Sequence, residues 1–257
     1  MCGITGYVGE REAAPIVIDG LSRLEYRGYD SVGIAVLEKN GGLAIHKRAG
    51  KLGSFASEVT GQELKGRQGI GHTRWATHGK PTDLNAHPHT DCTGNVVVIH
   101  NGIVENHAEL KQRLVAEGHT FRSETDTEVI PHLIELFLAE GDDLNSALIK
   151  TIQQIRGAHA ILAMSLSEPG TIVAARVGNA GGVVIEREQR RALRAHLSAE
   201  VPVADHGERV RDHGYAQAVL LDVLRIRVVH QPPTLDEFHP GQVREEMTHQ
   251  ALHTPTR

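Results

Sequence analysis

The order of apolar and polar positions predicts a chain of short strands and amphipathic helices. Runs rich in β-branched residues and bounded by turn residues predict strands at residues 4–8, 33–37, 43–46, 69–73, 96–100, 160–165 and 171–175. Asn40 and Gly41 lie between the second and third of these runs and suit the tight turn of a hairpin. Residues 96–99 are all apolar, which predicts a strand covered on both faces.

Helices are predicted where apolar residues recur at helical spacing, at residues 13–24, 105–117, 129–139 and 144–155. Gly118 and Gly141 follow two of these segments and are typical of helix C-termini. Thr125 and Glu128 have the spacing of a capping box in front of the third segment. Because the strands come early and late and the helices are grouped between them, the fold class is predicted as α+β and not as a regular βαβ alternation.

Composition narrows the class of protein without indicating its chemistry. With 40% apolar and 23% charged residues among 257, the chain has the composition of a globular protein. Its net charge is −5 and only 4% of its residues are aromatic, so neither nucleic acid nor a membrane is expected as a partner. Two cysteines are too few for a disulfide scaffold, and there is neither a signal peptide nor a long apolar run, so we expect a cytoplasmic protein.

A change in composition divides the chain near residue 185. All lysines precede residue 151, and from residue 186 onward arginine alone supplies the basic charge. The regular pattern of strands and helices lies within residues 1–185. We therefore expect one folded domain over residues 1–185 and an atypical, poorly ordered tail over residues 186–257.

Cys2 is the first residue with candidate chemistry. Loss of Met1 would make Cys2 the N-terminal residue of the chain. Its own α-amine, with a pKa of about 7.7–8.0, would then be suited to accept the thiol proton. A chance cysteine at the second position, with no function, explains the same residue.

Two further segments carry groups that could bind an amino acid and its reaction intermediate. Arg74, with Thr77 and His78 beside it, matches the donors that a carboxylate needs, although a surface turn after a strand has the same composition. Asn101 and Gly102 could direct a side-chain amide and a backbone N–H at one developing oxyanion. An ordinary Asn-Gly turn at the end of a strand is the alternative.

The other polar groups have plainer explanations beside the functional ones. Asp126 could pair with an ammonium group of a substrate, but the helix dipole also favours an acid at a helix N-terminus. His87, His89 and Cys92 are ligand types that zinc accepts, but their spacing lacks a clear fourth ligand. We therefore expect a polar loop there and no metal. The sequence contains no Walker-type phosphate loop, and no cofactor is expected.

Six motifs, in order along the chain, resemble one known domain. They are MCGITGY at 1–7, LEYRGYDS at 24–31, GHTRWATHG at 71–79, NAHPH at 85–89, HNGIVEN at 100–106 and SETDTEV at 123–129. This series resembles the glutaminase domain of glutamine–fructose-6-phosphate aminotransferase (isomerizing), a class II glutamine amidotransferase. The RGYDS run favours this enzyme over amidophosphoribosyltransferase, asparagine synthetase and glutamate synthase, which share the domain type.

The resemblance implies a fold and a set of roles. The fold would be the four-layer αββα sandwich of N-terminal nucleophile hydrolases, in which two antiparallel sheets lie between helical layers. Cys2 would be the nucleophile with its free amine as the base, and Asn101 with the Gly102 amide would form the oxyanion hole. The residues implied to bind glutamine are Arg74 at the α-carboxylate with Thr77 and His78 beside it, Asp126 at the α-ammonium group, and Trp75 in a closing loop. The residues implied to support the nucleophile are Arg27, Gly28 and Asp30.

The resemblance ends within residues 176–185, and the two sugar isomerase domains of the family are absent from the sequence. It implies glutamine as the substrate, whereas fructose 6-phosphate could enter only through those missing domains. A homo-oligomer is compatible with the sequence. The tail is interpreted either as a divergent end or as an out-of-frame translation after a truncation. Two alternatives stay open: a catalytically silent relic or regulatory fragment, and a glutaminase that serves another acceptor in trans.

Overall fold

The computed structural model of the chain describes residues 2–61, 64–76, 79–178, 180, 184–187 and 221–227. Arg27 and the last two of these ranges are described by their backbone alone. Met1, Thr77, His78 and most of residues 186–257, for which the sequence made predictions, lie outside the described residues.

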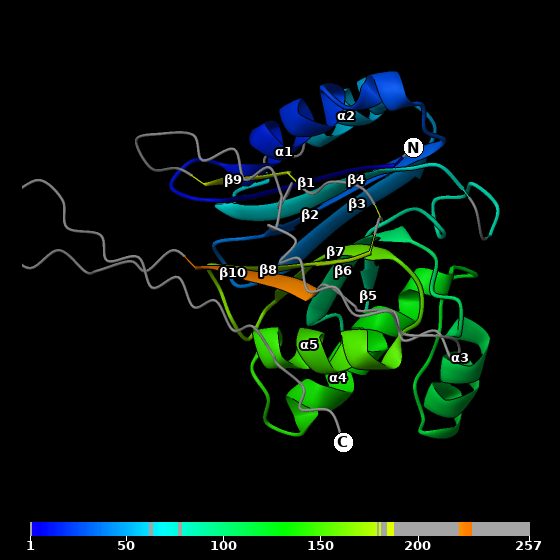
Figure 1. The fold of residues 1–257 in the computed structure, drawn as a ribbon. Helices are drawn as coiled ribbons and strands as arrows, with labels where there is room; N and C mark the ends of the chain where they lie inside the picture. The colour runs from blue at the N-terminus through cyan, green and yellow to red at the C-terminus, as the bar shows by residue number, and fades with distance from the viewer. Residues whose placement is uncertain are drawn as a thin grey trace, which may run out of the picture.

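Two five-stranded sheets lie face to face in the middle of the molecule (Figure 1). The first sheet has the order β3-β2-β4-β1-β9 and consists of β1 (Gly3–Val8), β2 (Ser31–Leu37), β3 (Leu43–Ala49), β4 (Gln68–Arg74) and β9 (Val184–Arg187). The second has the order β10-β8-β7-β6-β5 and consists of β5 (His89–Thr90), β6 (Val96–Gly102), β7 (His159–Ser165), β8 (Thr171–Val177) and β10 (Leu221–Arg227). Among these strands, all pairs are antiparallel except β1 and β9, which run parallel.

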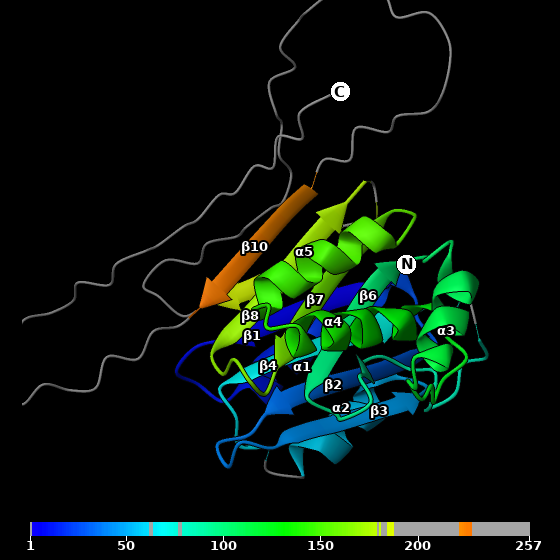
Figure 2. The same cartoon turned by 90° about the horizontal axis from the view of Figure 1, so that it is seen from below.

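Helices cover the outer side of each sheet, so the layers follow the order αββα (Figures 1 and 2). The first sheet is covered by α1 (Ala13–Ser22) and α2 (Leu52–Thr60), and the second by α3 (His107–Ala116), α4 (Val129–Ala139) and α5 (Leu144–Gln154). In the described part of the chain, no helix combines the length and apolar character required to cross a bilayer. The predicted α+β sandwich is confirmed.

Three apolar clusters fill the spaces between the four layers, and β6 contributes to two of them. Val97 and Ile99 point into the cluster between the sheets, whereas Val96 and Val98 point into the cluster beneath α4 and α5. All four are at most 1% exposed, which confirms the strand covered on both faces that the apolar run predicts. This strand therefore ends in a rigid position, and its last two residues are Asn101 and Gly102.

The predicted helices and strands are recovered with shifts of a few residues at their ends, but two elements and one cap differ. The short helix α2 and the two-residue strand β5 had no clear sequence signal. Thr125 does not cap the segment that follows it. Instead, the Glu128 carboxylate accepts the backbone N–H groups of Arg122 and Ser123 at 2.7 and 2.6 Å, so the acid of the expected box caps an earlier turn.

Two short strands lie in or next to the region predicted as a tail. β9 crosses the predicted boundary at residue 185 and extends the first sheet beside β1. β10 pairs with β8 and extends the second sheet with residues 221–227, within the region predicted as an atypical tail. Residues 219–224 are apolar except for Asp222, and this composition suits a strand. The division at residue 185 stays a prediction.

Candidate active site

The candidate site lies where β1 begins and β4 ends. These strands pair antiparallel with Gly3 opposite Thr73, and the Gly3 N–H donates to Thr73 Oγ1 at 3.1 Å. A Cβ on Gly3 would lie 2.7 Å from that oxygen, so the close approach requires glycine. The register brings Cys2 next to the end of β4, where the backbone N–H of Trp75 donates to Cys2 Sγ at 3.1 Å.

The segment after β4 is held in place from β2 and the turn before it. The Asp30 N–H donates to the Arg74 carbonyl at 2.8 Å, and Asp30 Oδ2 accepts the Ala76 N–H at 2.6 Å. Gly28 has a φ of +74°, and a Cβ there would lie 3.3 Å from the Trp75 ring. Asp30 and Gly28 thus position the segment that contacts the sulfur.

A hydrogen bond between β4 and β6 links the two sheets beside this segment. His72 Nε2 lies 2.8 Å from Asn101 Oδ1. Burial lowers the pKa of His72 to about 4, so the ring is neutral at pH 7 and donates from Nε2 to the Asn101 oxygen. The Asn101 carboxamide is thereby oriented, with its NH₂ group directed away from His72. Next to it, Gly102 has a φ of +134°, and a Cβ there would lie 2.1 Å from the Ala158 carbonyl oxygen, so only glycine fits.

A buried positive charge, Arg74, lies near the sulfur, and the buried carboxylate of Asp126 lies near Arg74. Arg74 and Asp126 are 5% and 4% exposed. Burial lowers the pKa of Arg74, and the nearby charges of Asp30, Cys2 and Asp126 act in the opposite direction. The Asp126 Oδ2 atom also accepts the Val104 N–H at 2.7 Å, which fixes the carboxylate. A buried guanidinium and a buried carboxylate in one region offer complementary partners to a zwitterionic ligand.

The acidity of Cys2 reflects opposing influences. Burial raises the pKa of the Cys2 thiol and is the largest effect, whereas the Trp75 N–H and the Arg74 charge favour the thiolate. The thiol is therefore mostly protonated at neutral pH, and a nucleophilic role would require a base.

A layer of five buried histidines lies behind Asn101, and no role was expected from sequence for any of them there. They are His72, His87, His89, His100 and His159. The first two stack with ring centroids 4.3 Å apart, and His100 Nε2 lies 3.0 Å from His159 Nδ1. Burial lowers the pKa of all five, so they are neutral hydrogen-bonding groups at pH 7. Only the recurrence of histidine in the NAHPH and HNG segments could have suggested this layer.

The zinc ligands considered from sequence do not come together as one set. His87 packs on His72 and His89 bonds Thr125, whereas Cys92 contacts a different group of side chains. Two of the residues implied to bind glutamine, Thr77 and His78, lie outside the described residues, and so does the side chain of Arg27. Of the other implied residues, Cys2, Arg74 and Trp75 lie where β1 begins and β4 ends, and Asn101 and Gly102 end β6. Gly28 and Asp30 precede β2, and Asp126 lies in the turn before α4, where its charge acts on Arg74.

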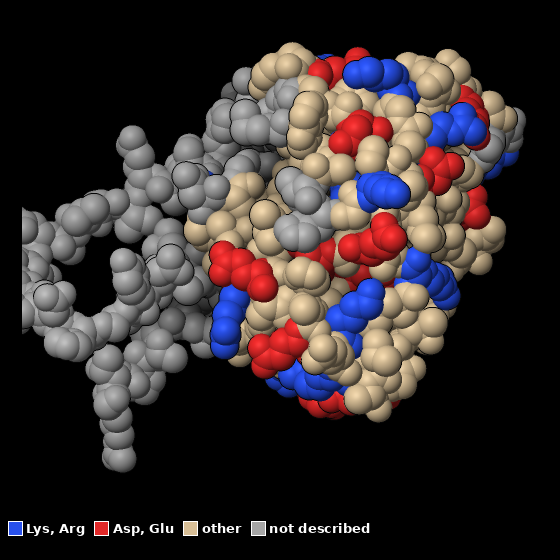
Figure 3. Space-filling model, turned by 90° about the vertical axis from the view of Figure 1, so that its right-hand side faces the viewer, with Lys and Arg blue, Asp and Glu red and all other residues tan. Residues whose placement is uncertain are grey.

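The charge distribution on one face of the molecule is mixed. Figure 3 shows basic and acidic side chains interspersed on that face, without a continuous field of one sign. This face therefore offers no charge pattern that would steer a strongly charged partner toward it.

Comparison with known proteins defines the class to which this fold and site belong. A family model described as a glutamine amidotransferase domain matches residues 72–180. The glutamine phosphoribosylpyrophosphate amidotransferase from B. subtilis superposes with a TM-score of 0.57 at 28% identity, over 68% of this chain and 37% of that chain. A structure of the allosteric regulatory enzyme of purine biosynthesis gives a TM-score of 0.58 at 28% identity, over the same shares of both chains. The chain carries a class II glutamine amidotransferase domain with the N-terminal nucleophile hydrolase fold.

Curated relatives narrow the class to one kind of glutaminase domain. Glutamine–fructose-6-phosphate aminotransferase (isomerizing) from Thermus thermophilus is 55% identical over 176 residues, covering 68% of this chain and 28% of that protein. The same enzyme from Methanothermobacter thermautotrophicus is 53% identical over 177 residues, covering 68% of this chain and 30% of that protein. The chain spans less than a third of the length of these relatives. Over the matched residues, the chain is similar to part of these aminotransferases.

Proposed function

We propose that this chain hydrolyses the side-chain amide of glutamine to glutamate and ammonia, with Cys2 as the nucleophile. The observation that carries the proposal is the position of Cys2 Sγ, 3.1 Å from the Trp75 N–H and close to the buried charge of Arg74. The glutamine amidotransferase domain supports the same reaction.

The reaction begins with transfer of the Cys2 thiol proton. In a chain that has lost Met1, the free α-amine of Cys2, with a pKa of about 7.7–8.0, accepts this proton. The thiolate then forms a bond to the amide carbon of glutamine, and the carbonyl π electrons move onto the oxygen. The Trp75 N–H and the Arg74 charge assist because both favour the thiolate over the thiol.

The negative oxygen of the intermediate needs preorganised donors. The NH₂ group of Asn101 and the backbone N–H of Gly102 supply them, and the bond from His72 to the Asn101 oxygen supports this orientation. When the C–N bond breaks, the protonated amine gives its proton to the leaving nitrogen, and ammonia departs. Water, deprotonated by the same amine, hydrolyses the thioester to glutamate and restores the thiol.

The α-carbon groups of glutamine are recognised by charge. Arg74 binds the α-carboxylate through paired N–H donors, and Asp126 binds the α-ammonium group. The low exposure of both side chains supports this assignment, because the charges are weakly screened by water. Trp75, which is 55% exposed, would close over the ligand together with Thr77 and His78.

The wider setting follows from the relatives. Their name, glutamine–fructose-6-phosphate aminotransferase, supports fructose 6-phosphate as the acceptor of the ammonia wherever isomerase domains accompany this domain. Acting without them, the chain releases ammonia to solvent or to a partner. We assign it to the cytoplasm, and a homo-oligomer is compatible with this function.

The decisive experiment measures glutamate release by the full chain, with the state of the N-terminus defined by intact mass. We expect turnover by the chain that lacks Met1, and none by a chain that retains it, because an amide nitrogen at Cys2 is not basic. Cys2→Ala should lower kcat by about 1,000-fold or more. Its circular dichroism and melting temperature serve as the folding control.

Two outcomes would contradict the proposal. Full activity with Met1 retained would exclude the amine as the base, and unchanged activity in Cys2→Ala would exclude the nucleophile. A folded, correctly processed wild-type chain without activity would favour the silent relic or regulatory fragment.

A further inference from the structure

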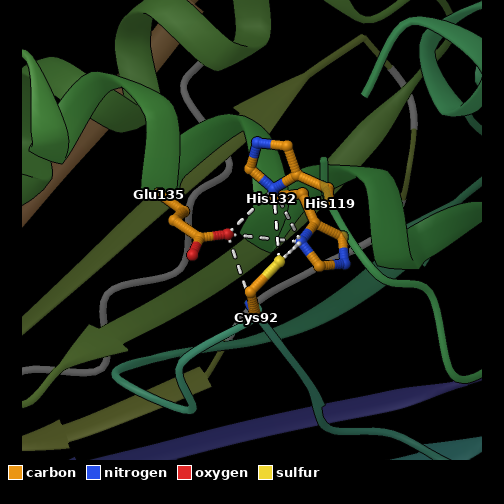
Figure 4. A group of neighbouring side chains, drawn as sticks. All are labelled: Cys92, His119, His132 and Glu135. Carbon is orange, nitrogen blue, oxygen red and sulfur yellow. Dashed lines mark hydrogen bonds and ion pairs between the residues drawn. The ribbon is translucent and has the colours of Figure 1, made fainter. Parts of the chain in front are cut away.

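The second cysteine of the chain lies in a cluster that the proposed reaction does not use. Cys92 follows β5, His119 follows the end of α3, and His132 and Glu135 lie on α4. Figure 4 shows the four side chains pointing toward one centre. Two local features direct these side chains toward the centre. Residues three apart on a helix share a face, and Gly118, with a φ of +99°, ends α3 and turns the next residue inward.

Four of the separations between the ligand-type atoms are those of a tetrahedral metal site, and a fifth, between His119 and Glu135, is slightly shorter. Cys92 Sγ lies 3.4 Å from His119 Nδ1 and 3.4 Å from His132 Nδ1, and the two nitrogens are 3.3 Å apart. Glu135 Oε2 lies 3.0 Å from His119 Nδ1 and 3.4 Å from His132 Nδ1. Bonds of about 2.0–2.1 Å to nitrogen and about 2.3 Å to sulfur place neighbouring ligands of a tetrahedral zinc ion about 3.3–3.6 Å apart. All four atoms lie within 4.8 Å of one another.

The cluster is largely enclosed by protein. The side chains of His132, His119 and Glu135 are 0%, 9% and 19% exposed. Four protein groups already surround the centre, so no position is left for a substrate or a reactive water. This arrangement is typical of a structural site and not of a catalytic one.

Groups around the cluster favour the ligand forms of its members. The Thr120 N–H lies 3.5 Å from Cys92 Sγ, where it favours a thiolate. The Glu128 carboxylate lies 4.0 Å from His132 Nε2, the ring nitrogen opposite the one that points into the cluster, which is beyond hydrogen-bonding distance but close enough for its charge to favour a proton on Nε2. A carboxylate on this side of a histidine favours the tautomer that leaves Nδ1 free to ligate a metal ion.

We propose that Cys92, His119, His132 and Glu135 bind one zinc ion. The mixture of thiolate, imidazole and carboxylate suits zinc, and the thiolate disfavours magnesium and calcium. On binding, the thiol proton is released to solvent and both imidazoles ligate through Nδ1 in their neutral form. The ion would join the loop after β5, the end of α3 and the helix α4, and so stabilise the helical layer outside the second sheet. This replaces the expectation of no metal drawn from sequence.

The alternative is a metal-free hydrogen-bond network among the same four side chains. Its atoms are within hydrogen-bonding distance, since one imidazole can donate to Glu135 while the other accepts from the thiol. The two states differ in what they predict for chelation, because a network of this kind is complete without an ion.

The experiment uses the full chain, stripped with a chelator and then exposed to zinc alone. We expect about one zinc per chain by elemental mass spectrometry, and a rise of several degrees in melting temperature on zinc addition. Cys92→Ser and His119→Gln should each weaken zinc binding at least about tenfold and abolish the thermal shift. Cys2→Ser and His46→Gln are the matched controls, since each removes the same residue type elsewhere, and they should bind zinc like the wild type.

Cobalt substitution gives a second readout that requires no variant. Co²⁺ in this cluster should show the visible bands of tetrahedral cobalt together with a thiolate-to-cobalt charge-transfer band that Cys92→Ser removes. Wild-type protein that binds no zinc, or that binds it as well after Cys92→Ser and His119→Gln, would overturn the proposal. A cobalt spectrum without the tetrahedral and thiolate bands would also overturn it.

Discussion

Cys2 and Cys92 are both partly buried, and burial raises the pKa of both thiols, but their neighbours differ in kind. Cys2 receives a backbone N–H at the end of a strand and lies near the positive charge of Arg74. Cys92 is surrounded by two imidazoles and a carboxylate, all aimed at the same centre. The acidity of the thiol therefore does not distinguish the two sites. The neighbouring side chains distinguish them, because two imidazoles and a carboxylate around Cys92 could bind a metal ion in place of the thiol proton.

The two regions are also built in different ways. The candidate active site is assembled from the ends of β1, β4 and β6. The positions of these ends are set by strand pairing within each of the two sheets. The Cys92 cluster is assembled from one helix and two loops, which have no such ladder to hold them. A catalytic group needs rigid surroundings that leave one side accessible to substrate. Segments without strand pairing, in contrast, gain stability when they bind one metal ion together.

Within the candidate active site, apart from loss of the nucleophile, the largest effect on kcat is expected for Asn101→Ala. Loss of one donor to the oxyanion should lower kcat about 100- to 1,000-fold, or about 2.7–4 kcal/mol, with little change in KM. Steady-state kinetics check this, with the exposed Asn95→Ala as the matched control. If the candidate active site and the Cys92 cluster are independent, the zinc content of Asn101→Ala should equal that of the wild type. An unchanged kcat would exclude Asn101 from the oxyanion hole.

The buried histidines should make the zinc-free protein sensitive to mild acid. The pKa of His72 is about 4 in the folded state and about 6.5 when unfolded, so below pH 6.5 the unfolded chain binds the proton first. The free energy of unfolding should therefore fall as the pH decreases through this window, by on the order of 3 kcal/mol from His72 by pH 4. Urea titrations in chelator from pH 7 downward test this, and a flat profile between about pH 6.5 and pH 5, above the usual carboxylate range, would contradict it.

Substitution of Arg74 should weaken glutamine binding. Arg74→Ala removes a bidentate charge-assisted pair worth about 1.5–3 kcal/mol, which corresponds to a KM raised about 10- to 100-fold. Arg74→Lys should fall between this variant and the wild type, because lysine keeps the charge but not the paired donors. Initial rates over a range of glutamine concentrations separate KM from kcat. A wild-type KM in Arg74→Ala would refute the assigned role.

The smallest expected effect distinguishes the two cysteines directly. Alkylation by iodoacetamide, followed residue by residue by mass spectrometry, should be slowed several-fold at Cys92 by zinc and at Cys2 by the product glutamate. Neither ligand should protect the other cysteine. Zinc protection of Cys2, or equal protection of both residues by either ligand, would contradict the separation of the sites.

Much of the fold could be predicted because its signals are local. The apolar run of β6 and the glycines that end α3 and α4 act through neighbours within a few residues. The exceptions have physical reasons. α2 is short with an exposed polar face, and Thr125 bonds His89 from a distant strand instead of capping its own segment. No periodicity marks the candidate catalytic residues. Their chemistry suggested them, and the motif resemblance favoured their functional roles over the plainer alternatives.

Residue spacing explains the limit of local reasoning. Periodicity reports positions two apart in strands and three or four apart in helices, and this is sufficient to predict these elements and the order in which they occur. The bond between Trp75 N–H and Cys2 Sγ spans 73 positions, and that between His72 and Asn101 spans 29. Cys92 and His132 are 40 positions apart, with His119 between them in the chain. Such contacts depend on strand register and helix packing, which arise only when the whole core forms. The sequence could therefore suggest Cys92 with the nearby His87 and His89, but not with His119 and His132, which contact it in the structure.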